Sequence, residues 1–123
     1  MGEWSIDVDE SANRLYMVLS GHFDAEAAAE ATDEVIDAAG FLTEGFEMIS
    51  DLQELQIGDP GAAEELERGK SYLADRGLAA AVRVPPTAVS SQDQFEEVGQ
   101  TAESYWLATA ESVAAAERLL DER

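Results

Sequence analysis

Residues 46–52 read FEMISDL and residues 78–84 read LAAAVRV, two apolar runs that each have the length of a β-strand. Between them, Ala62, Leu66 and Leu73 recur at the spacing of one helical face. A strand, a helix and a second strand in fewer than forty residues predict a βαβ unit, whose strands are parallel. Because such sheets commonly carry function in the loop after a strand, the loop that follows the first run is the expected working edge.

The chain before this unit predicts a hairpin and a helix. Residues 4–8 alternate apolar and polar side chains, and residues 15–19 form another short apolar run. A few polar residues join them, which favours an antiparallel pair. Asp24 is a good N-cap for a helix over residues 25–39, and Gly40 stands where a C-terminal glycine belongs.

The chain after the unit predicts two further helices and one strand. Two prolines follow the second run, and Ser91 can begin a short helix. Residues 104–108 read as the last strand, and Thr109 can cap a final helix. The predicted order is β-β-α-β-α-β-α-β-α. Residues 1–123 are therefore expected to form one α/β domain, a single-layer mixed β-sheet with packed helices.

Size and composition exclude several classes of protein. The chain has 123 residues, no cysteine and one histidine, so thiolate catalysis and an ordinary His- or Cys-rich zinc site are excluded. No stretch approaches the ~20 apolar residues that span a bilayer, and the first residues do not resemble a secretion signal. We therefore expect a soluble, cytoplasmic protein.

The charge of the chain is extreme, with 27 acidic against 7 basic residues and a formal net charge of −20. Phosphate backbones and anionic membranes need clustered cations, so we expect neither nucleic acid nor membrane as a partner. The acidic side chains could attract a basic protein partner. However, it is spread over the whole chain, and Lys70 is the only lysine. This pattern favours a halophilic origin, in which an acidic surface keeps the protein dispersed in molar salt.

Two motifs resemble a known family. Residues 18–24 read VLSGHFD, a hydrophobic strand, a glycine and an aspartate that opens a helix; residues 48–52 read MISDL, a strand that ends in aspartate. With the order of elements, these motifs resemble the STAS domain superfamily, and more closely its stand-alone SpoIIAA-like anti-sigma factor antagonists. The resemblance covers nearly the whole chain. It implies a non-enzymatic, cytoplasmic regulatory module that binds a protein partner.

In those antagonists the loop after the second motif carries Asp-Ser-Ser-Gly, and a partner kinase phosphorylates the first serine. If Gly61 is the family glycine, Asp59 stands at the phosphoacceptor position and Pro60 replaces the second serine. Asp59 could then mimic a permanently charged state, or it could only cap the helix. The residues expected to form or shape the contact with a protein partner are Asp51, Leu55, Ile57, Gly58, Asp59 and Gly61.

The sequence raises three other possibilities: a metal site, an enzyme and a carrier of a small ligand. Asp51, Glu54 and Asp59 could hold a hard cation, but such clusters arise by chance in so acidic a sequence, and no metal or cofactor is expected. No nucleophile, base and orienting group can be assembled, so we do not expect an enzyme. The alternative function is a carrier of a small apolar, lipid-like ligand. Its cavity would be lined by Phe95, Trp106, Leu119 and Leu120.

Overall fold

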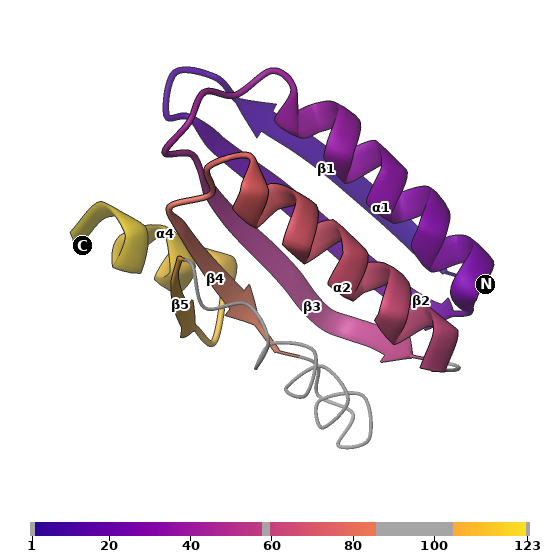
Figure 1. Ribbon diagram of the computed structural model, residues 1–123. Helices are drawn as coiled ribbons and strands as arrows, with labels where there is room; N and C mark the ends of the chain where they lie inside the picture. Colours follow the sequence, from indigo (N-terminus) through magenta and orange to yellow (C-terminus); the bar gives the residue numbers. More distant parts are fainter. Residues whose placement is uncertain (1, 58–59, 86–104, 123) are drawn as a thin grey trace.

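The computed structural model describes residues 2–57, 60–85 and 105–122, and it contains one five-stranded sheet (Figure 1). The strands lie in sequence order across the sheet; β1 and β2 are antiparallel, and all other neighbours are parallel. The mixed sheet, the hairpin and the βαβ unit are therefore confirmed. The elements are β1 (Glu3–Asp9), β2 (Arg14–Phe23), α1 (Ala25–Ala39), β3 (Glu47–Ile57), α2 (Pro60–Asp75), β4 (Ala80–Val84), β5 (Trp106–Thr109) and α4 (Val113–Glu122).

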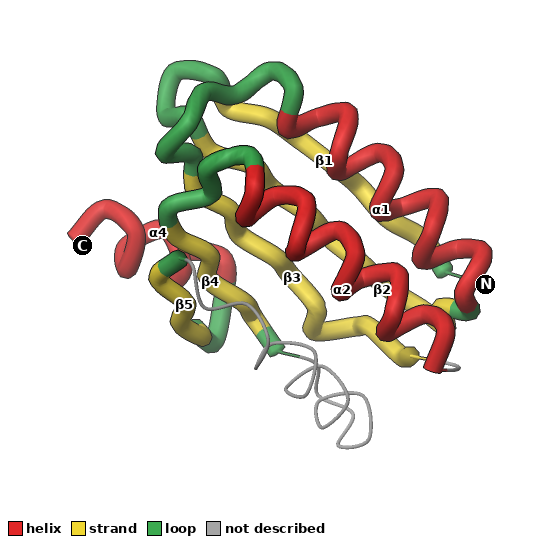
Figure 2. Tube along the Cα trace, in the orientation of Figure 1, coloured by secondary structure: helices red, strands yellow, loops and turns green. Residues whose placement is uncertain are grey.

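The described helices cover the two faces of the sheet unequally. α1 and α2 lie side by side over one face, where their apolar side chains share the main core with Leu19 and Leu52 (Figures 1 and 2). α4 lies on the opposite face, where Leu120 packs in a second cluster with Val82. The two sides of the sheet therefore bury separate sets of apolar side chains.

β3 is longer than the sequence predicts. We expected the strand to end at Leu52 and a loop to follow, but residues 53–57 continue as strand. The prediction was wrong because β2 also continues to Phe23 and pairs with this stretch. One extra residue of β3 is absorbed where the register shifts, as in a β-bulge. Oδ1 of Asp51 accepts hydrogen bonds there from the backbone N–H of Gln53 at 3.3 Å and from its side-chain amide at 3.1 Å.

The helix ends agree only in part with the predictions. The side chain of Asp24 caps α1 by accepting a hydrogen bond from the N–H of Ala27 at 2.8 Å, as expected. Gly40, however, has right-handed helical φ and ψ, so it is not the left-handed C-terminal glycine that we expected. Thr109 lies in β5, and the hydroxyl of Ser112 accepts from the N–H of Ala115 instead. The predicted helix that begins at Ser91 lies outside the described residues.

α1 and α2 approach each other most closely at Gly69. A Cβ atom added at Gly69 would lie 2.9 Å from Cγ2 of Thr32, which is closer than such atoms pack. The hydroxyl of Thr32 donates to the carbonyl of Glu65 at 3.2 Å, and Arg68 forms an ion pair with Asp33 at 3.1 Å. The helices are therefore joined by a close contact and by polar bonds. Within the part of the chain that the structure describes, no helix is both long and apolar enough to cross a membrane.

Polar bonds also hold α4 against the sheet. The buried guanidinium of Arg14 in β2 contacts the carboxylate of Glu47 in β3 at 2.8 Å and that of Asp121 in α4 at 3.0 Å. The hydroxyl of Tyr16 donates to Glu117 at 3.0 Å. These bonds fix the end of the chain over β2 and β3.

Candidate functional site

The expected working edge is where β2 and β3 end and α2 begins. Phe23 and Ile57 are the last register partners of the two strands, and α2 begins at Pro60. His22 and Gln56 are exposed at this edge and are also register partners. The edge therefore brings the end of β2 beside the end of β3 and the beginning of α2, although α1 separates β2 from them in the sequence.

The six residues expected to contact a partner do not all lie at this edge. Gly61 is half-buried in the first turn of α2. Ile57 ends β3, while Gly58 and Asp59 lie outside the described residues, as does the side chain of Ile57. Asp51 lies six residues before the end of β3, which is about 20 Å along a strand. It holds the bulge rather than the edge.

Leu55 cannot be an exposed contact. Its side chain is 1 % exposed and packs in the main core under α1 and α2. We expected Leu55 to shape the contact with a partner because the sequence predicted a loop here. In a strand, alternate side chains point to opposite faces, and the bulge shifts this alternation by one residue, so Leu55 lies in the main core together with Met48 and Leu52.

The cavity expected for an apolar ligand is not formed by its predicted residues. Leu119 and Leu120 pack with the second cluster beneath α4, and Trp106 is 42 % exposed on the edge strand. Phe95 lies outside the described residues. The described members of this set therefore do not line a common cavity between the sheet and α4.

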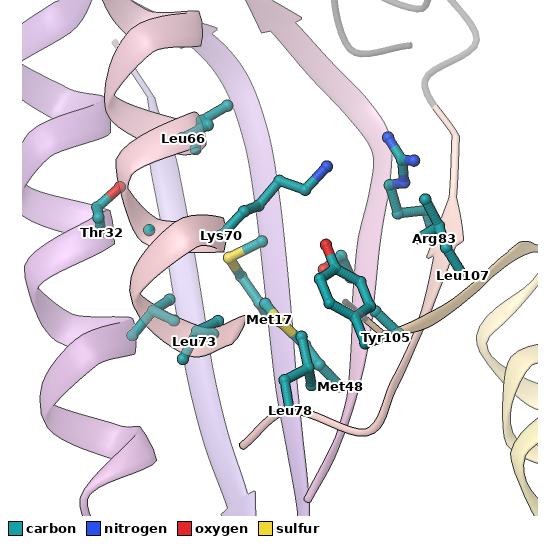
Figure 3. Close-up of a pocket in the computed structure, with 14 residues that line it drawn as sticks. Met17, Thr32, Met48, Leu66, Lys70, Leu73, Leu78, Arg83, Tyr105 and Leu107 are labelled. Carbon is teal, nitrogen blue, oxygen red and sulfur yellow. The ribbon is translucent and has the colours of Figure 1, made fainter. Parts of the chain in front are cut away.

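A pocket does lie on the other face, between α2 and the parallel strands (Figure 3). Its volume is about 50 Å³, far below the 300–1,000 Å³ of typical small-molecule sites. Most of its walls are apolar side chains, including Met17, Met48, Leu66 and Leu73. The described walls therefore form a small apolar recess in the main core.

Polar groups gather at one side of this recess. Lys70 extends from α2 toward β4, where Arg83 lies, and the ring of Tyr105 stands beside them (Figure 3). We call Lys70, Arg83 and Tyr105, with the apolar walls around them, the basic pocket. The sequence reasoning missed it. Two signals could have found it: Lys70 is the only lysine, and Arg83 interrupts the apolar run of residues 78–84.

The charges of the basic pocket influence one another. Burial is the main reason why the pKa of Lys70 falls from 10.5 to about 8, and the nearby positive charge of Arg83 lowers it further. The carboxylate of Glu67 acts in the opposite direction. Burial also raises the pKa of the Tyr105 hydroxyl, which therefore stays protonated at neutral pH. The pocket thus offers ammonium, guanidinium and hydroxyl donors.

Neither a family model nor a curated protein matches this chain. Solved structures do match it. The anti-sigma factor antagonist SpoIIAA in its unphosphorylated form aligns over 96% of this chain and 98% of its own, with a TM-score of 0.61 and 17% identity. The chain has the SpoIIAA-like fold.

Two further structures share that fold. An uncharacterized DUF3478-family protein from Shewanella loihica PV-4 aligns over 97% of this chain and 95% of its own, with a TM-score of 0.67 and 16% identity. The STAS domain of an antisigma-factor antagonist from Rhodobacter sphaeroides aligns over 77% and 95%, with a TM-score of 0.53 and 9% identity. At these identities the likeness concerns the fold alone, and it confirms the predicted SpoIIAA-like fold over nearly the whole chain.

Proposed function

We propose that this chain is a non-enzymatic regulatory module that binds a protein partner at the edge where β3 ends and α2 begins. The observation that carries the proposal is the fold match over almost the whole chain to an anti-sigma factor antagonist. SpoIIAA has been solved in an unphosphorylated and a phosphorylated form, so that protein is modified. In our proposal, Asp59 takes the phosphoacceptor position and the contact works without phosphorylation.

The partner would meet a polar and acidic edge. Gln56 and Pro60 are exposed on either side of the residues at 58–59, and Glu64 is exposed one turn further along α2. Leu55 anchors the last part of β3 in the core, whereas Asp51 stabilises the bulge further back along the strand. Charge at such an edge sets specificity and association rate more than affinity, so the expected partner carries a basic patch.

The proposed setting is a cytoplasm of high salt. Carboxylates cover the outer side of α1, where Glu26, Glu30 and Asp37 are exposed. An acidic surface of this kind supports a halophilic origin, because it keeps a protein dispersed when salt screens its charge. In such salt, a partner must be recognised by short-range contacts at the edge.

An affinity capture in molar KCl tests the proposal, with the folded protein as bait and lysate of its own source. We expect one stoichiometric protein that the wild type recovers and the Asp59→Arg variant does not. Asp75→Arg is the matched control, because it makes the same charge reversal at the exposed far end of α2. Equal recovery by all three baits would contradict docking at this edge.

The substitution Asp59→Ala distinguishes a contact with the partner from a role as a helix cap. If Asp59→Ala lowers the free energy of unfolding by ~1 kcal/mol and leaves capture intact, Asp59 is only a helix cap. Loss of capture at unchanged stability supports the contact.

The alternative function, a carrier of a lipid-like ligand, has less support. The apolar recess of the basic pocket has a volume of about 50 Å³, which does not hold a lipid chain. A co-purifying lipid in the same capture, without a protein, would favour the carrier.

A further inference from the structure

β1 forms one border of the sheet, and its outer side pairs with no described strand. It pairs with β2 alone, in a regular register along its whole length of 7 residues. Shortness, lysine, proline or a bulge commonly prevents further pairing at such a strand, and none of these occurs in β1. One row of its backbone N–H and C=O groups therefore faces outward, where a further strand can form hydrogen bonds.

One hollow lies between β1 and α1, which runs along this strand (Figure 1). It is open to solvent, and its volume is about 410 Å³. The partly buried side chains of Trp4 and Ile6 form its apolar part. Glu34 and Asp37 of α1 are exposed beside them, and Glu34 accepts a hydrogen bond from the indole N–H of Trp4. An apolar floor with carboxylates next to it suits lysine or arginine, which have a long apolar stem and a charged end.

A second hollow lies on the opposite face of the hairpin, with a volume of about 540 Å³. Val18 is 40 % exposed there, although it stands in the middle of β2. Its register partner in β1 is Ser5, so the two side chains are neighbours on the surface of the sheet. A small apolar and a small hydroxyl group suit the β-branched side chains of valine or threonine from a neighbouring strand.

The charges around β1 select the kind of strand that can pair with it. Among the described residues that line the two hollows, none is basic. A second copy of β1 would place its own Glu3 and Asp7 against this acidic surface, so like charges oppose a dimer formed through this strand. The exposed carboxylates of Glu30, Glu34 and Asp37 follow one another at roughly 5–6 Å along α1. Alternate residues of a strand are ~7 Å apart, so successive basic side chains can each reach a carboxylate.

We propose that β1 binds an extended segment of a partner protein, which adds a strand to the border of the sheet. Lysine or arginine at alternate positions of this segment contacts the carboxylates of α1, and the valine or threonine between them lies beside Val18. Backbone hydrogen bonds and direct ion pairs act at short range, so they persist in salt that screens longer distances. β2 separates this surface from β3, and the proposal does not depend on a protein contact at the β3–α2 edge.

Titration with the acetylated and amidated octapeptide TKVKVKVT, followed by amide NMR in 0.3 M KCl at pH 7, tests the surface. We expect saturable shifts of amides in β1 and on the side of α1 that faces it. Hydrogen exchange should slow at alternate amides of β1, because an added strand pairs with every second residue of its neighbour. The peptide TKKKVVVT has the same composition and charge without the alternation. It should bind about tenfold more weakly, because its side chains cannot match both hollows.

A charge reversal on α1 tests which side of β1 receives the lysines. Asp37→Lys should weaken the binding of TKVKVKVT about fivefold, because an exposed ion pair becomes a repulsion. Asp75→Lys makes the same charge reversal at the exposed far end of α2 and should leave the affinity unchanged. Both substitutions replace an exposed side chain of a helix, so both variants should fold, and their amide spectra show whether they do.

Four results would overturn the proposal. Without saturable shifts in β1 there is no such site. If TKKKVVVT binds as tightly as TKVKVKVT, the peptide is attracted only by the net charge of the protein. If Asp37→Lys and Asp75→Lys have equal effects, the lysines do not lie beside α1. If the free protein sediments as a dimer that the peptide dissociates, β1 pairs with a second copy of this chain, and the partner class is wrong.

Discussion

Asp24 shows how one side chain defines the beginning of an element. Its carboxylate accepts the N–H of Ala27 at 2.8 Å and so satisfies a donor that α1 cannot satisfy internally. We expect Asp24→Ala to lower the free energy of unfolding by about 1 kcal/mol, measured with urea in 1 M KCl. Asp24→Asn keeps an acceptor and should lose less. A loss no greater than that of Glu30→Ala, an exposed mid-helix change, would contradict this role.

Lys70 gives a prediction on the dependence of stability on pH. Its pKa is about 8 in the folded protein and 10.5 as the ordinary value, so between these values the unfolded chain binds more protons. The free energy of unfolding should therefore rise from pH 8 toward pH 10.5, by on the order of 1–3 kcal/mol. Below pH 8 the unfavourable effect of the charged amine is fully present.

The measurement compares urea unfolding of the wild type and Lys70→Met between pH 7 and 9.5. The pKa values of Tyr16 and Tyr105 are raised above 10, so their opposite effect begins above this range. Lys70→Met should be more stable at pH 7, and the difference should shrink as the pH rises. A difference that is constant with pH would show that Lys70 titrates normally.

At the scale of the elements, Gly69 sets the distance between α1 and α2. We expect Gly69→Ala to destabilise the protein by about 1 kcal/mol, although alanine favours helices, because its Cβ would lie 2.9 Å from Cγ2 of Thr32. Thr32→Ser removes that methyl group and keeps the hydroxyl that donates to Glu65. In this background Gly69→Ala should become neutral or stabilising. Additive effects in the double-mutant cycle, measured by urea unfolding, would contradict the contact.

The elements also show what the sequence could predict. The central βαβ unit, the hairpin and the cap of α1 follow from local patterns, because periodicity and capping act within a few residues. The second half of β3 does not, since residues 53–57 mix polar and apolar side chains like a loop. They are strand because β2 extends beside them, and this pairing partner lies about thirty residues away.

The basic pocket was unpredictable for a similar reason. Lys70 lies in α2, Arg83 in β4 and Tyr105 directly before β5, and only the tertiary fold brings these separate segments to one recess. The β3–α2 edge remains a prediction, and its position follows from the sequence because the carboxyl ends of parallel strands are recurrent sites. The residues exposed at this edge could not be predicted correctly, because the sequence predicted a loop at Leu55, whose side chain is buried in a strand.

At the scale of the whole molecule, the net charge of −20 opposes folding. Salt shortens the range of this repulsion from ~10 Å at 0.1 M to ~3 Å at 1 M. We expect the free energy of unfolding to increase by about 2 kcal/mol between 0.1 and 2 M KCl, which corresponds to roughly 8 °C in Tm for a domain of this size. Thermal unfolding followed by circular dichroism measures the shift.

The control for this salt effect is a variant with three fewer negative charges, Asp7→Asn, Glu30→Gln and Asp37→Asn. All three side chains are exposed and lie on β1 and α1. If repulsion is the cause, the variant should be more stable than the wild type at 0.1 M KCl, and the two should converge at 2 M, because salt then screens what the substitutions removed. If the stabilities of the two proteins rise in parallel with KCl concentration, salt acts by strengthening apolar burial instead. This effect is the same in both proteins. In that case the acidic surface serves dispersion alone.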